Sequence, residues 1–234
     1  MDTLLGIVEA FVNFVYPPTC MTCWRDLKRG EAFICMKCWD SFERVSPTEA
    51  IIQAIERKFL IDETVDKIDA VFLFEQDPGV RTAVHLLKYG GAEKIADRFG
   101  ILIAGKIVGD PKLSMCDMLA PVPLHPARKR ERGYNQSELI AERLSGELGI
   151  RHEPDLLRRV RQTQSQTMFD AEGRRRNIAG AFSIAERFTS EVKGKKILLI
   201  DDVITTGSTI KECAGVLRNN GASEVYGAAA AVTI

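Results

Sequence analysis

From about residue 68 onward, two kinds of apolar segment alternate along the chain. Short runs rich in Val, Ile, Leu and Phe have the length of buried strands, and longer segments with apolar residues every three or four positions have the helical period. This alternation predicts an α/β fold in which a parallel sheet is covered by helices. We expect strands at 70–74, 118–124, 156–160, 181–184, 196–200 and 225–234, and helices at 91–108, 135–148 and 209–219.

The chain before residue 68 has a different pattern. Apolar residues at helical spacing over 4–15 predict an amphipathic helix that ends at Pro17 and Pro18. Its polar face lacks the Lys and Arg of a helix that lies on a membrane, so we expect its apolar face to pack on the rest of the protein. A second segment with helical character, 49–67, predicts a packed connector to the sheet domain.

Composition and charge narrow the class of protein. Hydrophobic residues make up 45% and charged residues 27% of the 234 residues, which is typical of a globular chain. Lys and Arg together number 32, as do Asp and Glu, so any attraction for nucleic acid must be local. No apolar run approaches the roughly 18 residues of a membrane span, and no basic segment of a signal peptide opens the chain. We therefore expect a cytoplasmic protein without a membrane span.

Four of the six cysteines form two pairs, Cys20 with Cys23 and Cys35 with Cys38, separated by eleven residues. Each C-x2-C turn presents two thiolates to one point, and two such turns supply the tetrahedral sulfur set that Zn2+ prefers. The spacing predicts a structural zinc site in a small zinc ribbon, with a hairpin turn at Gly30 and a return strand at 33–34. Two reactive disulfide motifs, or an iron site, are the alternatives. The pairs are flanked by Trp and basic residues, which either bind single-stranded nucleic acid or simply pack.

The segment 197–209, ILLIDDVITTGST, carries the most informative chemistry. It lies between a predicted strand and a predicted helix, where open α/β sheets bind ligands. Hydroxyl residues around Gly207, next to a helix N-terminus, suit a phosphate dianion. The adjacent acids Asp201 and Asp202 would repel that phosphate, so we expect them to face a vicinal diol, directly or through Mg2+. A diol and a phosphate describe a 5-phosphoribosyl group. The alternative is an ordinary turn followed by a Ser or Thr N-cap.

This segment resembles the phosphoribosyl pyrophosphate (PRPP) motif of type I phosphoribosyltransferases. Further segments extend the resemblance to the ComF family of competence proteins, which combine a zinc module with a phosphoribosyltransferase-like domain. They are Lys88-Tyr89-Gly90, residues 121–124, Arg128, residues 132–136, Gln166, Arg174 and residues 177–182. The resemblance implies three regions: 1–48 with the helix and zinc ribbon, the connector 49–67, and the phosphoribosyltransferase-like domain 68–234.

The motif and the resemblance together give a set of candidate site residues. Asp201 and Asp202 are the catalytic candidates, and Cys20, Cys23, Cys35 and Cys38 are the metal ligands. The candidates for binding PRPP are Val203, Thr205, Thr206, Gly207, Ser208, Thr209, Lys88, Arg128, Arg132, Gly133, Gln166 and Arg174.

Two stretches between the motifs are expected to complete the site. Residues 128–132 carry a net charge of +3 and lie where a type I enzyme has its pyrophosphate loop, with Gly133 allowing close approach of the backbone. Residues 161–176 lie where the family has a flexible loop and would form a lid over the reactive C1 carbon, unless they are an ordinary surface loop. No hood that recognises a base follows the last strand, so residues 71–91 are a candidate for that role.

Three functions follow from these observations. The first is binding of PRPP with Mg2+ and transfer of the phosphoribosyl group to an unidentified acceptor, which makes the protein a phosphoribosyltransferase with a role in natural transformation. The second is handling of single-stranded DNA through local arginine clusters at 128–132, 158–161 and 174–176, with a non-catalytic sugar-phosphate site. The third is docking of other competence proteins on the zinc ribbon.

Overall fold

A computed structural model of the chain describes residues 17–46, 49–59, 64–161 and 178–234. The predicted helix over 4–15, nearly all of the expected lid, and the candidates Gln166 and Arg174 lie outside the described residues. Of the helices in the described ranges, none combines the length and the apolar character needed to cross a membrane.

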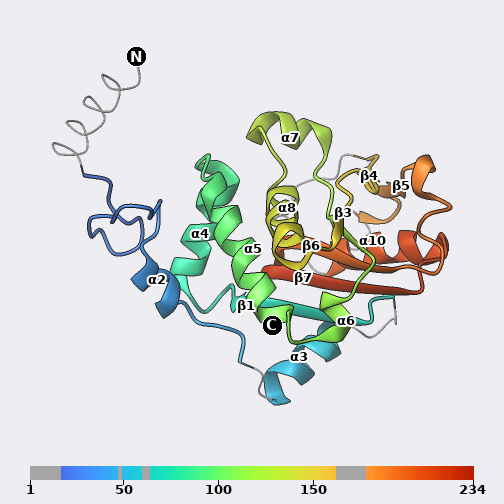
Figure 1. Ribbon diagram of the computed structural model, residues 1–234, viewed down its shortest axis with the longest axis horizontal. Helices are drawn as coiled ribbons and strands as arrows, with labels where there is room; N and C mark the ends of the chain where they lie inside the picture. Colours follow the sequence, from blue (N-terminus) through green and yellow to red (C-terminus); the bar gives the residue numbers. More distant parts are fainter. Residues whose placement is uncertain (1–16, 47–48, 60–63, 162–177) are drawn as a thin grey trace.

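The core of the fold is a parallel sheet of five strands (Figure 1). In spatial order these are β1 (Lys67–Leu73), β7 (Glu224–Val232), β6 (Lys196–Ile204), β2 (Met118–Pro121) and β3 (Arg151–His152). The central strands β6 and β7 are apolar along most of their length because helices cover both faces of the sheet. This confirms the parallel α/β sheet that the sequence predicts.

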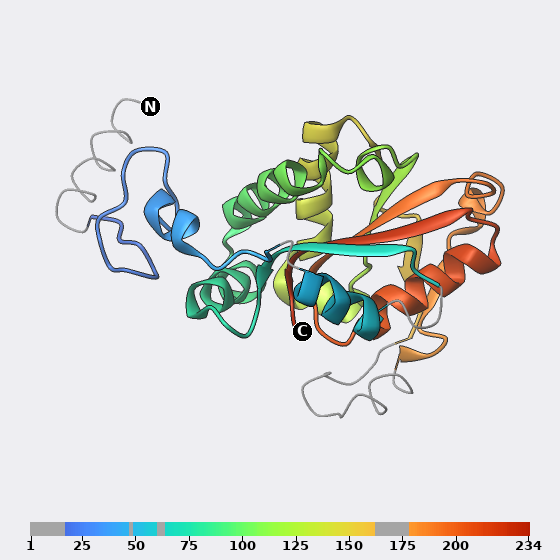
Figure 2. The same ribbon diagram turned by 90° about the horizontal axis from the view of Figure 1, so that it is seen from below.

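Helices form a layer on each side of the sheet, as Figure 2 shows. One face packs against α4 (Pro78–Tyr89), α5 (Glu93–Ile107) and α8 (Gln136–Leu148). The other packs against α3 (Glu49–Phe59) and α10 (Ser208–Asn219). Alternate residues of β6 divide between the two cores, with Leu198 and Ile200 on the first face and Ile197 and Leu199 on the second. Short helices α6 (Pro111–Ser114), α7 (Pro126–Arg132) and η2 (Glu186–Phe188) complete the described connections.

Two features of the body differ from the sequence prediction. Strands do form near 156–160 and 181–184, as β4 (Leu157–Arg159) and β5 (Phe182–Ile184), but they pair antiparallel with each other in a separate sheet. The candidate hood over 71–91 belongs to the body instead, as the end of β1 and the helix α4. An N-cap at Asp77 followed by proline at the first helical position is the sequence signal for α4 that the apolar pattern does not show.

The cysteine module is less regular than the predicted zinc ribbon. Gly30 forms a turn with φ of +89°, but the expected return strand at 33–34 is reduced to a single bridge between Ala32 and Ile34. Phe33 has φ of +60°, a left-handed conformation that breaks an extended strand. The chain then enters the short helix α2 (Met36–Ser41), which carries Cys38 and Trp39.

Aromatic packing attaches this module to the sheet domain. Trp39 is buried, and its ring lies 5.2 Å from that of Phe42 and 5.4 Å from that of Phe99 on α5. Phe42 also packs edge-on against Phe72 of β1, at 5.8 Å. Hydrogen bonds between 43–45 and β1, including Val45 N–H to the Val71 carbonyl at 2.8 Å, cover the outer edge of the sheet. Trp39 is therefore part of the core and is not available to stack on nucleic acid.

The contact between α4 and the cysteine module predicts that adding a single methyl group at Gly79 destabilises the folded protein. A Cβ atom at Gly79 would lie 2.2 Å from Cε1 of Phe42, whose ring is held by Trp39 and Phe72 and has no free space to move into. We expect Gly79→Ala to lower the free energy of unfolding by about 1–3 kcal/mol, as measured by denaturant titration. A Cβ atom at Gly105, on the exposed side of α5, would meet no neighbouring group within 4 Å, so Gly105→Ala should stabilise the protein. Equal stability of the two variants would contradict this packing.

Candidate functional site

The site is an open pocket of about 340 Å³ beyond the carboxyl ends of β2 and β6. Residues from the end of β6, from 122–124 directly after β2, from α4, and from the starts of α8 and α10 surround it, so the sheet order brings together segments far apart in sequence. This is the position at which open parallel sheets bind ligands. Its polar lining consists of Lys88, Tyr89, Arg128, Arg132, Asn135, Gln136, Ser137, Arg159, Asp201, Asp202, Thr205, Thr206, Ser208 and Thr209.

The two adjacent acids form the floor of the pocket. Asp201 Oδ1 accepts hydrogen bonds from Ser137 Oγ at 3.0 Å and from the Asp202 N–H at 2.9 Å. Asp202 Oδ1 accepts from the Val203 N–H at 2.8 Å, and its other oxygen lies 2.9 Å from Lys88 Nζ. The carboxylates are thus oriented by α8, by the strand itself and by α4.

Burial makes these charges interdependent. The pKa of Asp201 is raised to about 7, mainly because the carboxyl is removed from water and secondly because Asp202 is charged. Burial alone would lower the pKa of Lys88, but the adjacent charge of Asp202 outweighs it and the pKa is raised. Near neutral pH the Asp201 carboxyl is therefore only partly ionised, and the Lys88 ammonium lies beside the Asp202 carboxylate. Hydroxyl donors or a divalent cation could replace the proton on Asp201 or the ammonium beside Asp202.

The loop after β6 provides the second element of the pocket. Thr205 and Thr206 lead to Gly207, whose φ of +72° turns the chain into α10 at Ser208. The hydroxyls of Thr206 and Ser208 lie 2.9 Å apart. The first turn of a helix leaves backbone N–H groups without partners inside the helix, and the helix dipole favours an anion there. The loop can therefore bind a phosphate without any cationic side chain of its own.

Cationic side chains gather on the opposite side of the pocket. Residues 128–132, expected as a pyrophosphate loop, belong to the helix α7, which has no buried residue and ends at Gly133 with φ of +85°. Arg128 and Arg132 of this helix line the pocket together with Lys88. Gly133 caps α7 and is not among the lining residues, so its expected approach to a ligand has no support in this geometry.

Several lining residues could not be identified from the sequence. Arg159 lies on β4 and lines the pocket, whereas the sequence pattern indicates only a surface arginine cluster there. Its pKa is lowered by burial and then by the charge of Arg128, so the two guanidinium groups are neighbours. Ser137 and Gln136 lie at the start of α8, after the N-cap Asn135, whose side chain accepts from the Ser137 N–H. Gln136 lies in the segment 132–136 that carries the family resemblance, although no role follows for it from the sequence, and nothing in the local sequence distinguishes Ser137 from an ordinary first helical turn.

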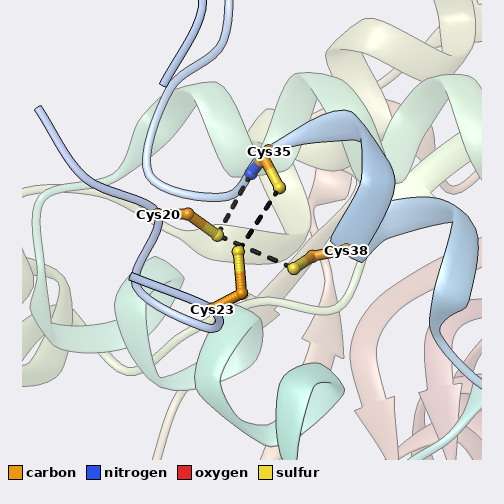
Figure 3. Close-up of side chains that lie close together, drawn as sticks. All are labelled: Cys20, Cys23, Cys35 and Cys38. Carbon is orange, nitrogen blue, oxygen red and sulfur yellow. Dashed lines mark hydrogen bonds between the residues drawn. The ribbon is translucent and has the colours of Figure 1, made fainter. Parts of the chain in front are cut away.

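The four paired cysteines converge, as Figure 3 shows. Their sulfur atoms all lie within 4.8 Å of one another, and the Cys20–Cys38 and Cys23–Cys35 sulfur pairs are each 3.8 Å apart. Tetrahedral zinc–thiolate bonds of about 2.3 Å place sulfur atoms about 3.8 Å apart. None of the four forms a disulfide. The cluster could therefore hold a zinc ion.

Comparisons with known proteins agree with this architecture. The sequence profile described as "Phosphoribosyl transferase domain" matches residues 114–232. Competence protein F of Haemophilus influenzae is 39% identical over 114 residues, which are 49% of this chain and 49% of that protein. DNA utilization protein YhgH of Salmonella typhimurium is 34% identical over 158 residues, 66% of this chain and 68% of the relative. The chain thus spans between about half and two thirds of the length of these relatives.

Glutamine PRPP amidotransferase from B. subtilis aligns with 62% of this chain and 30% of its own, at 20% identity and a TM-score of 0.38.

The raised pKa of Asp201 predicts how stability depends on pH. Because the pKa rises from 3.8 to about 7 on folding, the folded state holds this proton more tightly, and stability falls as pH rises between these values. Asp201→Asn removes the buried charge. We expect the variant to exceed the wild type by about 1–3 kcal/mol in free energy of unfolding at pH 8 and to match it near pH 4. Denaturant titrations at both pH values, with the exposed Asp97→Asn as control, measure the difference. A variant less stable than wild type at pH 8 would contradict the assignment.

Proposed function

Because the chain belongs to the phosphoribosyl transferase domain family and, within it, to the ComF family of competence proteins, we propose that it binds PRPP with Mg2+ and transfers the phosphoribosyl group. The observation that carries the proposal is the pairing, in one pocket, of two adjacent buried acids with a hydroxyl loop at a helix N-terminus. A vicinal diol and a phosphate are the ligand groups that fit these two elements.

Each part of PRPP has a partner in the proposed complex. Asp201 and Asp202 accept hydrogen bonds from the ribose hydroxyls, and the loop 205–209 binds the 5-phosphate. Lys88, Arg128 and Arg132 neutralise the diphosphate. Four cations line the pocket against two carboxylates, so the empty site has the positive charge that a ligand with several phosphates requires.

Transfer then follows from charge stabilisation. The C1–oxygen bond to the diphosphate breaks, the electron pair leaves with the diphosphate, and the acceptor nucleophile forms the new bond to C1. Lys88 and the arginines stabilise the charge that develops on the leaving oxygens. Carboxylate oxygens are ligands that Mg2+ prefers, so Asp201 and Asp202 are suited to it, and when bound it adds positive charge at the diphosphate. The identity of the acceptor is open.

The names of the relatives support a cellular role for this reaction. The two curated proteins are named for competence and for DNA utilization. We propose that this chain acts in the same process, on a soluble sugar phosphate in the cytoplasm, where a protein with six unpaired cysteines is chemically stable.

Direct binding of DNA is the second candidate function. Lys129 and Arg130 on α7 are exposed basic side chains, and Arg158 and Arg161 are also exposed. Such residues suit a phosphate backbone. DNA has no 2′-hydroxyl to offer the paired acids, so a DNA strand would bind along this exposed surface and not on the floor of the pocket.

We expect wild-type protein with Mg2+ to bind PRPP in a calorimetric titration. The Asp201→Asn/Asp202→Asn double variant should weaken binding by about 100-fold, because it removes two charged acceptors of ligand hydrogen bonds. The Asp97→Asn/Asp155→Asn variant, which changes surface charge equally, should bind normally. Absence of PRPP binding by the wild type, together with salt-sensitive binding of a single-stranded oligonucleotide, would replace this proposal with DNA handling.

We further propose that the four cysteines hold a structural Zn2+, which serves as the core of a module with few apolar residues. Cys38→Ala should abolish stoichiometric zinc, measured by mass spectrometry of the native protein, and lower the free energy of unfolding by about 3 kcal/mol or more. Cys116→Ala, which alters a buried cysteine outside the cluster, should retain the metal. Purified wild-type protein that contains iron in place of zinc, or no metal under reducing conditions, would refute the assignment.

A further inference from the structure

Gln136 is a buried polar residue of the pocket that the proposed mechanism does not use. It is the first residue of α8 and only 2% exposed. Its side-chain Oε1 accepts a hydrogen bond from Arg132 Nη1 at 3.0 Å. Its Nε2 is fully buried and has no hydrogen-bond partner among the described residues. One end of the amide is therefore fixed, and the other lacks an acceptor.

The orientation of this amide is dictated by Arg132. A guanidinium group can only donate hydrogen bonds, so Gln136 must present its oxygen to Arg132 and direct its two N–H donors elsewhere. Leaving a buried donor unpaired is unfavourable. An oxygen acceptor is therefore missing from the ligand-free pocket.

Arg132 is in turn held from the other side by Tyr89. The Arg132 guanidinium lies 5.0 Å from the centre of the Tyr89 ring, and its Nη2 donates to the Tyr89 hydroxyl at 3.2 Å. Tyr89 is 63% exposed at the end of α4, so its ring is not retained by burial in the core. Tyr89, Arg132 and Gln136 form a chain of contacts from the rim of the pocket to its buried side.

The groups around Gln136 indicate which kind of ligand group would accept a hydrogen bond from its Nε2. Lys88 and Arg128 line the same pocket as Arg132, and the N-terminus of α8, a helix of 13 residues, begins at Gln136 itself. These groups favour an anion. The next residue, Ser137, binds Asp201, so Gln136 adjoins the proposed diol site. An anion attached to C1, the carbon next to the C2 hydroxyl, fits this position better than the 5-phosphate at the other end of the ribose.

We propose that Gln136 binds the diphosphate of the ligand through its Nε2, and that Arg132 and Tyr89 are positioning residues that set the direction of this amide. The inference rests on the proposed function and adds a determinant of specificity for diphosphorylated over simple sugar phosphates. Because Nε2 is covered in the ligand-free protein, binding includes a small shift of a neighbouring side chain, and the partly exposed Arg128 has the length to provide it.

The test compares ligands with and without a diphosphate. Zinc-loaded full-length protein with Mg2+ is titrated with PRPP, ribose 5-phosphate and inorganic diphosphate. Gln136→Glu keeps an acceptor for Arg132 but removes the donors and adds negative charge. We expect it to weaken binding of PRPP and diphosphate by about 10-fold or more and to change ribose 5-phosphate by less than about 2-fold. Gln76→Glu, at an exposed position outside the pocket, is the matched control.

The positioning role has its own readout. Tyr89→Leu removes the support of Arg132 and should weaken PRPP binding while leaving ribose 5-phosphate unchanged, and Tyr89→Phe should restore part of the loss through the ring. Thermal unfolding establishes that each variant is folded. If Gln136→Glu weakens all three ligands equally, or none, the assignment of Gln136 is overturned and the proposed function stands. If the wild type binds neither PRPP nor ribose 5-phosphate, the proposed function itself fails.

Discussion

Two carboxylates at adjacent positions on a buried strand are the constraint around which the rest of the site is arranged. Placing Asp201 and Asp202 together and away from water is unfavourable unless other groups compensate. The compensation comes from three elements, because Ser137 belongs to α8, Lys88 to α4, and the N–H donors to β6 itself. Only a sheet that places β6 centrally, with α4 and α8 on one face, brings these groups to one point. The two acids can therefore be kept in the pocket only because this sheet order brings their compensating groups to them.

The position of Lys88 depends on packing at both ends of one helix. The first turn of α4 contacts the cysteine module, since Gly79 lies against Phe42 and the Asp77 carboxylate accepts from the Glu43 N–H at 2.8 Å. Its last turn carries Lys88 and Tyr89 into the pocket. Between them, Val80, Val84 and Leu87 pack in the core. The module thus fixes the helix that supplies the counter-charge of Asp202, which gives the cysteine cluster a structural consequence beyond its own residues.

The sequence predicts well what depends on local chemistry. The parallel sheet follows from its apolar runs, the strand–loop–helix arrangement around Gly207 from its strand, hydroxyl and helix signals, and the sulfur cluster from the spacing of the cysteines. What it predicts poorly depends on tertiary pairing. β4 and β5 lie where the sequence predicts strands, but they pair antiparallel with each other in a separate sheet, and local sequence does not specify a strand's partner. Likewise the contributions of Arg159 and Ser137 to the pocket arise from tertiary packing, which no local pattern encodes. Roles expected for Gln166 and Arg174 remain predictions.

Charge is distributed in this protein so that a neutral chain has a positive site. Equal numbers of acidic and basic residues leave no net field, yet the pocket gathers Lys88, Arg128, Arg132 and Arg159 against Asp201 and Asp202. The acids are placed on the floor, where they face hydroxyl groups. Arg128 and Arg132 come from α7, Lys88 from α4 and Arg159 from β4, while the loop before α10 is uncharged. A ligand with phosphate at one end only would satisfy the loop and the acids but leave the cations facing one another. Mutual repulsion among these cations is relieved when a second anionic group binds, so the electrostatics of the empty pocket already favour a ligand that is anionic at both ends.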